Sequence, residues 1–100
     1  MTSADQRPWT FLTNHARVLV MISEDREIRL RDLSAMIGIT ERSAQRIVAE
    51  LEEAGYLTHE RVGRRNVYGV SLDVGLRHPH EQDVEIGLLL ALFSKAGIDT

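Results

Sequence analysis

The sequence predicts a mainly α-helical domain that carries a small β-hairpin, and three observations indicate this α+β class. Two helical stretches are separated only by a short turn at Gly38. Two strand-like runs flank Gly63-Arg64-Arg65, and an apolar helical stretch follows at residues 81–96. One hundred residues suit a single domain that buries one core without covalent cross-links. We therefore expect an arm at 1–12, a main domain at 13–72, a linker at 73–80 and a helical segment at 81–100.

The first predicted helix follows the arm. Thr13 or Asn14 offers an N-cap before the apolar stretch that begins at Ala16. The run at residues 18–22 is β-branched enough to be a buried strand on periodicity alone. The cap and the helix signals that follow favour a helix, and a helix that is apolar on all sides has to be buried on more than one side.

A pair of helices comes next. Leu30 and Leu33 begin an apolar series at helical spacing that continues with Met36 and Ile37, and Gly38 follows where a left-handed residue ends a helix. Thr40 is then an N-cap for a second helix, which runs from Glu41 to about Gly55.

The spacing within this pair favours a helix-turn-helix over an ordinary helical hairpin. Ser34 lies four residues before Gly38, and its small side chain lets the second helix cross closely. Ile39 is expected to fill the core beneath the turn, while Ala44 and Ile47 keep the crossing tight.

The strand-like runs are "YLTHERV" and "NVYGV". Leu57 on the first strand, and Tyr68 with Val70 on the second, are expected to pack on the helices. The linker that follows contains Pro79, and the last helix is predicted over residues 81–96, ending at Gly97.

The segment "LSAMIGITERSAQRIVAELEEAGYL", followed by a Gly-Arg-Arg hairpin, resembles the winged helix-turn-helix of MarR-like and ArsR-like bacterial transcription regulators. The resemblance covers roughly residues 14–72. It departs at Arg29, where a Ser or Thr cap is usual, and at Ser34, which replaces the common Ala. It implies a DNA-binding domain at 13–72, with a recognition helix at about 41–54 in the major groove. The wing, residues 61–68, would contact the backbone or the minor groove, and a helix is added at the C-terminal side.

Candidate DNA-contacting residues follow from a helical wheel and from the wing. The wheel puts Arg42 and Arg46 opposite the apolar stripe of the second helix, near its N-terminal end. Arginine can bind guanine and glutamine can bind adenine through two hydrogen bonds each. The predicted set is Thr40, Arg42, Ser43, Gln45, Arg46, Arg61, Arg64 and Arg65. The alternatives are a solvated helix face, with arginines paired to Glu50 or Glu53, and a charged hairpin tip that only maintains solubility.

The charge distribution is compatible with one basic face. The chain has 12 basic and 15 acidic residues, a net charge of −3. Residues 61–77 nevertheless contain four arginines and one acid, whereas residues 78–100 contain one lysine and four acids. Because only one surface has to be positive, the acidic total does not exclude DNA binding.

The apolar surface of the predicted last helix indicates that the protein binds a protein partner. Its apolar residues lie almost all around it, and so small a monomer has little core left to bury them. A symmetric homodimer would cover them and would place two recognition helices on successive major-groove faces. The candidate dimerisation residues are Trp9, Phe11, Leu88, Leu89, Leu92 and Phe93. The alternative for Trp9 and Phe11 is that they cap the monomer's own core.

Other functions have weaker support. The chain has no phosphate-binding glycine loop, nucleophile elbow or HExxH run, so we expect no enzyme and no cofactor. His78 and His80 flank a proline without a spaced third ligand, so we expect a plain linker and no metal site. The main rival is a winged helix that binds another protein and no nucleic acid. Nothing in the sequence indicates a small-molecule effector.

The sequence also bears on location. It has no cysteine, and "MTSADQRPW" lacks the pattern of a secretion signal. The longest apolar run, residues 88–93, is too short to span a bilayer. We therefore expect a cytoplasmic protein that makes no membrane contact.

Overall fold

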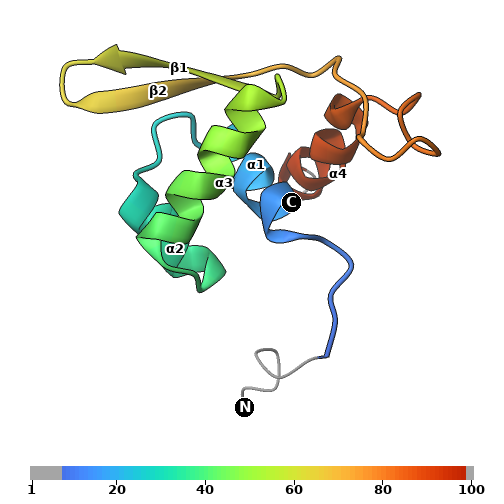
Figure 1. Cartoon of the computed structure of the whole chain (residues 1–100). Helices are drawn as coiled ribbons and strands as arrows, with labels where there is room; N and C mark the ends of the chain where they lie inside the picture. The colour runs from blue at the N-terminus through green and yellow to red at the C-terminus, as the bar shows by residue number, and fades with distance from the viewer. Residues whose placement is uncertain (1–7, 99–100) are drawn as a thin grey trace.

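The computed structural model describes residues 8–98, with side chains to residue 94. The helices are α1 (Asn14–Glu24), α2 (Leu30–Ile37), α3 (Glu41–Glu53) and α4 (Ile86–Ile98), and the strands are β1 (Leu57–Val62) and β2 (Arg65–Val70) (Figure 1). The predicted class, mainly α with a small hairpin, is confirmed. Residues 1–7 of the predicted arm and residues 99–100 lie outside the described part.

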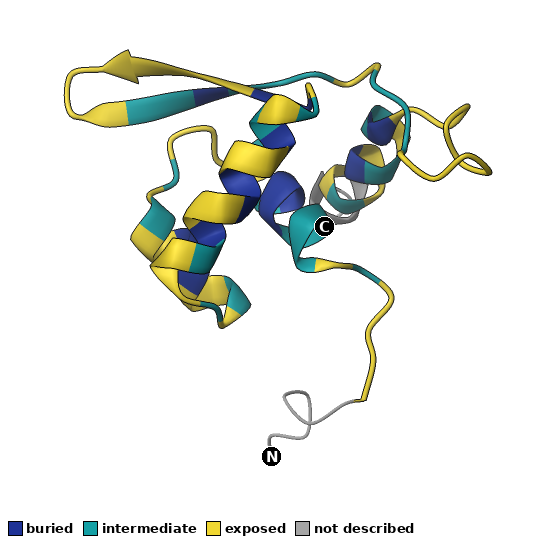
Figure 2. Cartoon of the chain, in the orientation of Figure 1, coloured by how far each residue is buried: buried dark blue, intermediate teal, exposed yellow. Residues whose placement is uncertain are grey.

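α1 forms the centre of the core. It packs against α2, α3 and α4, and its middle is buried between them (Figure 2). Val18 and Ile22 are fully buried and Leu19 nearly so. The run at residues 18–22 is therefore helical, the strand reading is wrong, and the expectation of burial on several sides is confirmed.

The helix ends use the side chains that the sequence predicted. The N–H of Ala16 donates to Thr13 Oγ1 at 3.2 Å, which identifies Thr13 as the N-cap of α1. α2 ends at Gly38, which has φ of 90°, a left-handed conformation that costs a side-chain-bearing residue free energy. Arg29 is the N-cap of α2 and makes no side-chain capping hydrogen bond, as expected from its departure from Ser or Thr.

β1 and β2 form an antiparallel hairpin with a turn of two residues, Gly63 and Arg64. Arg65 lies just past the turn, as the first residue of β2, and pairs with Val62. At the other end the side chains of Leu57 and Tyr68 are buried, so the base of the hairpin packs on the helices. The tip extends away from them (Figure 1).

The predicted start of the last helix is wrong. Residues 81–83 form a turn, Glu85 pairs with Gly75 in an antiparallel bridge, and α4 begins at Ile86. The N–H of Leu76 donates to Val84 O at 3.0 Å and the N–H of Ile86 donates to Val74 O at 2.8 Å. Because these bonds pair residues 74–76 with residues 84–86, the backbone becomes helical only from Ile86.

The predicted end of that helix is also wrong. α4 continues through Gly97 to Ile98. A glycine inside a helix costs only about 1 kcal/mol relative to alanine, so it does not by itself end a helix.

No helix in the described part of the chain is long and apolar enough to cross a membrane.

Candidate nucleic-acid interface

α3 presents one buried and one exposed face. Its buried residues are Ala44, Ile47, Val48 and Leu51, which pack into the core. The opposite face exposes Arg42, Gln45, Arg46 and Ala49, and Ser43 lies between the two faces, half-buried. This distribution agrees with the helical wheel, and it leaves an arginine, a glutamine and a second arginine facing solvent within the first two turns.

Thr40 and Ser43 form the N-terminal end of α3. The N–H of Ser43 donates to Thr40 Oγ1 at 3.0 Å, and the Thr40 hydroxyl donates to Ser43 Oγ at 3.0 Å. The Thr40 hydroxyl thus caps the helix, and the Ser43 hydroxyl accepts a hydrogen bond from it. The predicted Thr40 N-cap is confirmed, and these two residues fix the start of the helix that carries the arginines.

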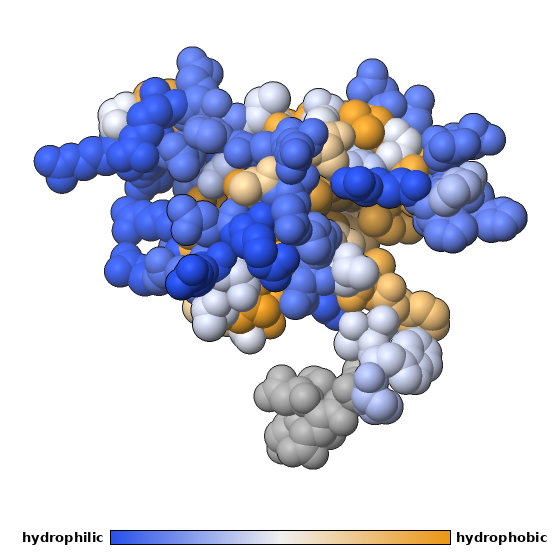
Figure 3. All heavy atoms as spheres, in the orientation of Figure 1, coloured by the Kyte–Doolittle hydropathy of each residue, from blue (hydrophilic) through white to orange (hydrophobic). Residues whose placement is uncertain are grey.

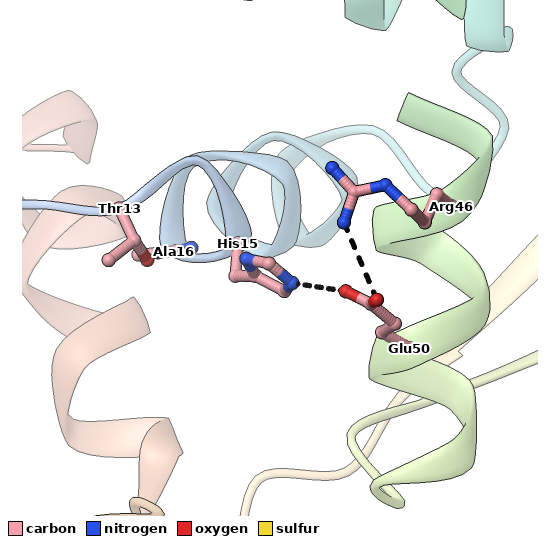
Figure 4. Close-up of polar contacts among 5 residues, drawn as sticks. All are labelled: Thr13, His15, Ala16, Arg46 and Glu50. Carbon is pink, nitrogen blue, oxygen red and sulfur yellow. Dashed lines mark hydrogen bonds and ion pairs between the residues drawn. The ribbon is translucent and has the colours of Figure 1, made fainter. Parts of the chain in front are cut away.

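A carboxylate on the same helix holds Arg46. Nη1 of Arg46 donates to Glu50 Oε2 at 3.4 Å, and His15 Nε2 lies 2.7 Å from Glu50 Oε1 (Figure 4). The hydrogen bond with His15, assisted by the charge of Arg46, lowers the pKa of the Glu50 carboxyl from its ordinary value of 4.5. The Arg46–Glu50 pair was one of the alternatives that the sequence left open. His15 comes from α1, 35 residues away, and no local signal indicates it.

The wing arginines lie around a groove. Arg61, Arg64 and Arg65 line it together with Arg29, and its other lining residues are Glu27, Ile28, Leu30, Asn66 and Tyr68. We call this hollow of about 490 Å³, between residues 27–30 and the hairpin, the wing groove. Nε of Arg61 donates to Gly63 O at 3.3 Å, which folds that side chain back toward the turn. The structure therefore brings together the three predicted wing arginines and adds Arg29.

The wing groove also contains an acid that sequence reasoning missed. Nη1 of Arg65 donates to Glu27 Oε1 at 3.1 Å, across 38 residues of sequence. Both side chains are about half exposed. In sequence the acid nearest the hairpin turn is Glu60, on β1, but the acid that contacts Arg65 is Glu27, from the loop between α1 and α2.

The wing and α4 lie at opposite ends of the molecule (Figure 1). The hairpin extends on the same side as α2, and the loop between α1 and α2 lies between the two. The side formed by the hairpin, α2 and α3 is largely hydrophilic in Figure 3, whereas apolar atoms gather toward α4. The exposed arginines are thus clear of the acidic C-terminal segment as far as that segment is described.

The predicted dimerisation residues divide into two groups. Trp9, Phe11, Leu88 and Leu92 are exposed, with 66%, 90%, 63% and 68% of their surface accessible. Leu89 and Phe93 are half-buried and pack against the monomer's core. The alternative in which Trp9 and Phe11 cap that core is wrong, because both side chains are exposed to solvent. Their rings contact each other edge to face, with the ring centroids 5.1 Å apart.

A second, larger hollow of about 760 Å³ lies near the C-terminal end of α3. Its apolar lining includes Leu19, Leu51 and Leu89, and its polar lining includes His15 and Glu50. In the linker beside it the rings of His78 and His80 stack 5.4 Å apart. Among the residues described, no group of three or more His, Asp or Glu side chains is placed to hold a metal ion.

A comparison with known protein families matches the part of the chain that contains α3 and the first strand of the hairpin. A family model described as MarR family matches residues 10–65, which span α1, the α2–α3 pair and the hairpin as far as the start of β2. This is more than half of the chain. No curated protein matches the sequence.

Proposed function

The chain belongs to the MarR family of DNA-binding transcription regulators, and from this premise we propose that it recognises specific sequences in double-stranded DNA. Members of this family are transcription regulators rather than enzymes. In the proposed complex α3 lies in the major groove and the hairpin lies along the adjacent backbone or minor groove.

The exposed face of α3 is the observation that carries this proposal. Arg42, Gln45 and Arg46 are solvent-facing near the end of the helix that a recognition helix presents to base edges. A guanidinium can bind guanine O6 and N7, and an amide can bind adenine N6 and N7. Each such pair contributes about 1–3 kcal/mol of discrimination against the wrong base.

The capped start of α3 supports this role. Thr40 and Ser43 hydrogen-bond each other, and Ala44 is fully buried against the core. A contact residue discriminates between bases only when its backbone is held in place. We propose that Thr40 and Ser43 also lie at the DNA surface, where their hydroxyls face the backbone.

We further propose a homodimer formed through the exposed apolar residues at the two ends of the chain. Trp9 and Phe11 precede α1, and Leu88 and Leu92 lie one turn apart on α4. Trp9 contacts Phe11, and exposed apolar side chains that adjoin one another indicate an interface more strongly than scattered ones do. Leu89 and Phe93 would support this interface from beneath. The cytoplasmic location expected from the sequence belongs to the same proposal.

Selection of bound duplexes from a random pool tests the proposal. We expect wild-type protein to enrich a defined motif, and Gln45→Ala to relax the preference at one base position. Arg42→Ala should likewise alter the preferred sequence, and Arg77→Ala is its matched control, because Arg77 is exposed and lies in the linker beside the larger hollow. If wild-type protein enriches no motif and binds no duplex at low salt, the DNA-binding proposal is refuted and the protein-binding alternative takes its place.

A further inference from the structure

We propose that the wing groove binds a backbone phosphate of duplex DNA, with Arg29 as an additional ligand, and that this phosphate displaces Glu27 from Arg65. The inference rests on the proposed DNA-binding function and deepens it. It adds Arg29, which lies outside both the recognition helix and the hairpin, to the DNA contacts, and it gives an acidic residue a part in setting affinity.

The lining of the groove selects an anion. Four arginines line it (Arg29, Arg61, Arg64 and Arg65) and one acid, Glu27, which contacts Arg65. Guanidinium groups present paired N–H donors that match the oxygens of a phosphate. A groove with this excess of positive charge would attract a phosphate even though the whole chain is acidic.

The position of the groove selects a DNA backbone as the source of that phosphate. Arg29 and Leu30 stand at the start of α2, the helix that precedes α3. In a helix-turn-helix protein, the helix before the recognition helix crosses the DNA backbone. The hairpin closes the other side of the groove. A strand that passes α2 toward the wing would therefore run over it.

The groove is held in shape before any ligand binds. The N–H of Tyr68 on β2 donates to Arg26 O at 2.8 Å, which ties the loop between α1 and α2 to the wing. Within that loop, the N–H of Glu27 donates to Asp25 Oδ1 at 3.1 Å and the N–H of Ile28 donates to Asp25 O at 3.2 Å. Because these bonds already fix the loop, little ordering is required when a phosphate binds.

Glu27 opposes DNA in two ways. It occupies one of the N–H groups of Arg65 through the 3.1 Å contact, and its charge repels an approaching phosphate. An ion pair between half-exposed side chains is weak, so a phosphate can replace the carboxylate. Since the backbone is the same at every site, Glu27 would lower the affinity for all sequences equally and keep non-specific binding low.

Fluorescence anisotropy with the full chain tests this inference, using a selected duplex and an unrelated duplex over a range of salt concentrations. We expect Glu27→Gln to bind both duplexes more tightly by the same factor, about two- to fivefold, the range that a weak surface pair allows. Arg29→Ala should bind both more weakly, and its log–log salt slope should be shallower by about 0.9, the value for one lost phosphate contact.

Controls come from the same elements. Arg31→Ala is the control for Arg29→Ala, because it removes a positive charge from an exposed residue of α2 that does not line the groove. Glu24→Gln is the control for Glu27→Gln, because it removes a negative charge at the exposed end of α1. Both should change affinity and slope much less than the groove variants. Circular dichroism checks that each variant is folded.

A double variant tests whether Glu27 acts by competing with phosphate for Arg65 or only through its negative charge. In Glu27→Gln/Arg65→Ala, most of the gain from Glu27→Gln should disappear. If the full gain persists without Arg65, or if Glu27→Gln improves binding to only one sequence, the inference is overturned. It is also overturned, with DNA binding intact, if wild type binds DNA but Arg29→Ala keeps the wild-type slope. A wild type that binds no DNA overturns both this inference and the proposed function.

Discussion

Replacing the two arginines at the wing tip is the sharpest test of how this protein would bind the DNA backbone. Arg64 is in the two-residue turn, and Arg65 is the first residue of β2, where it pairs with Val62 of β1. Their alanine variants leave the buried base of the hairpin, Leu57 and Tyr68, untouched, so the fold should be retained. We expect Arg64→Ala/Arg65→Ala to weaken binding to every duplex without changing which sequence is preferred.

The size of the effect follows from counterion release. Each neutralised phosphate contributes about 0.9 to the slope of log affinity against log salt, so two lost contacts make the slope shallower by about 1.8. Between about 50 mM and about 200 mM salt, the double variant should then lose about 12-fold less affinity than wild type. Because Arg65 has to exchange Glu27 for phosphate, Arg64→Ala alone should cost more affinity than Arg65→Ala alone.

Anisotropy titrations at four or more salt concentrations measure this slope directly. Arg77→Ala serves as the control, since it removes an exposed arginine at the linker. Binding by the double variant that equals wild type at every salt concentration would show that the wing does not contact phosphate. A change in the preferred sequence without a change in slope would instead assign the wing to base readout.

Three further predictions concern the dimer, the turn and the titration of one carboxyl. Leu88→Glu/Leu92→Glu should convert a dimer into a folded monomer in sedimentation experiments, because both side chains are exposed on α4; a monomeric wild type would disprove the interface. Gly38→Ala should lower the free energy of unfolding in urea by about 1–2 kcal/mol through its left-handed φ alone, since an added Cβ meets nothing within 4 Å; unchanged stability would contradict this reasoning. His15→Ala should raise the pKa of Glu50 toward 4.5 in an NMR titration. Because that pKa is depressed in the folded state, the stabilisation is present above pH 4.5 and is lost as pH falls through the folded value, and an unshifted titration would argue against the contact.

Local signals in the sequence were sufficient for much of the fold. Thr13 and Thr40 start helices because their side chains satisfy backbone N–H groups within the next three residues. Gly38 ends a helix because it adopts a positive φ easily. Each of these effects depends on a few neighbouring residues, so a pattern read along the chain predicts it.

The start of α4 could not be predicted in that way. Glu81 and the residues after it are compatible with a helix, and the local pattern predicts one. The backbone of residues 74–76 instead pairs with that of residues 84–86, and the helix begins only where this pairing ends. Such a pairing depends on how the linker folds back, and no local propensity encodes it.

The candidate site shows the same division. The sequence by itself determined which side chains face solvent on α3, because a period of 3.6 residues assigns Arg42 and Arg46 to the side opposite the apolar stripe. Only the tertiary structure decided which acids meet the arginines. Glu27 reaches Arg65 across 38 residues, and His15 reaches Glu50 across 35. Helical periodicity is a local property of the chain, whereas the field at a charged group is set by whatever the packed elements bring within a few ångströms of it.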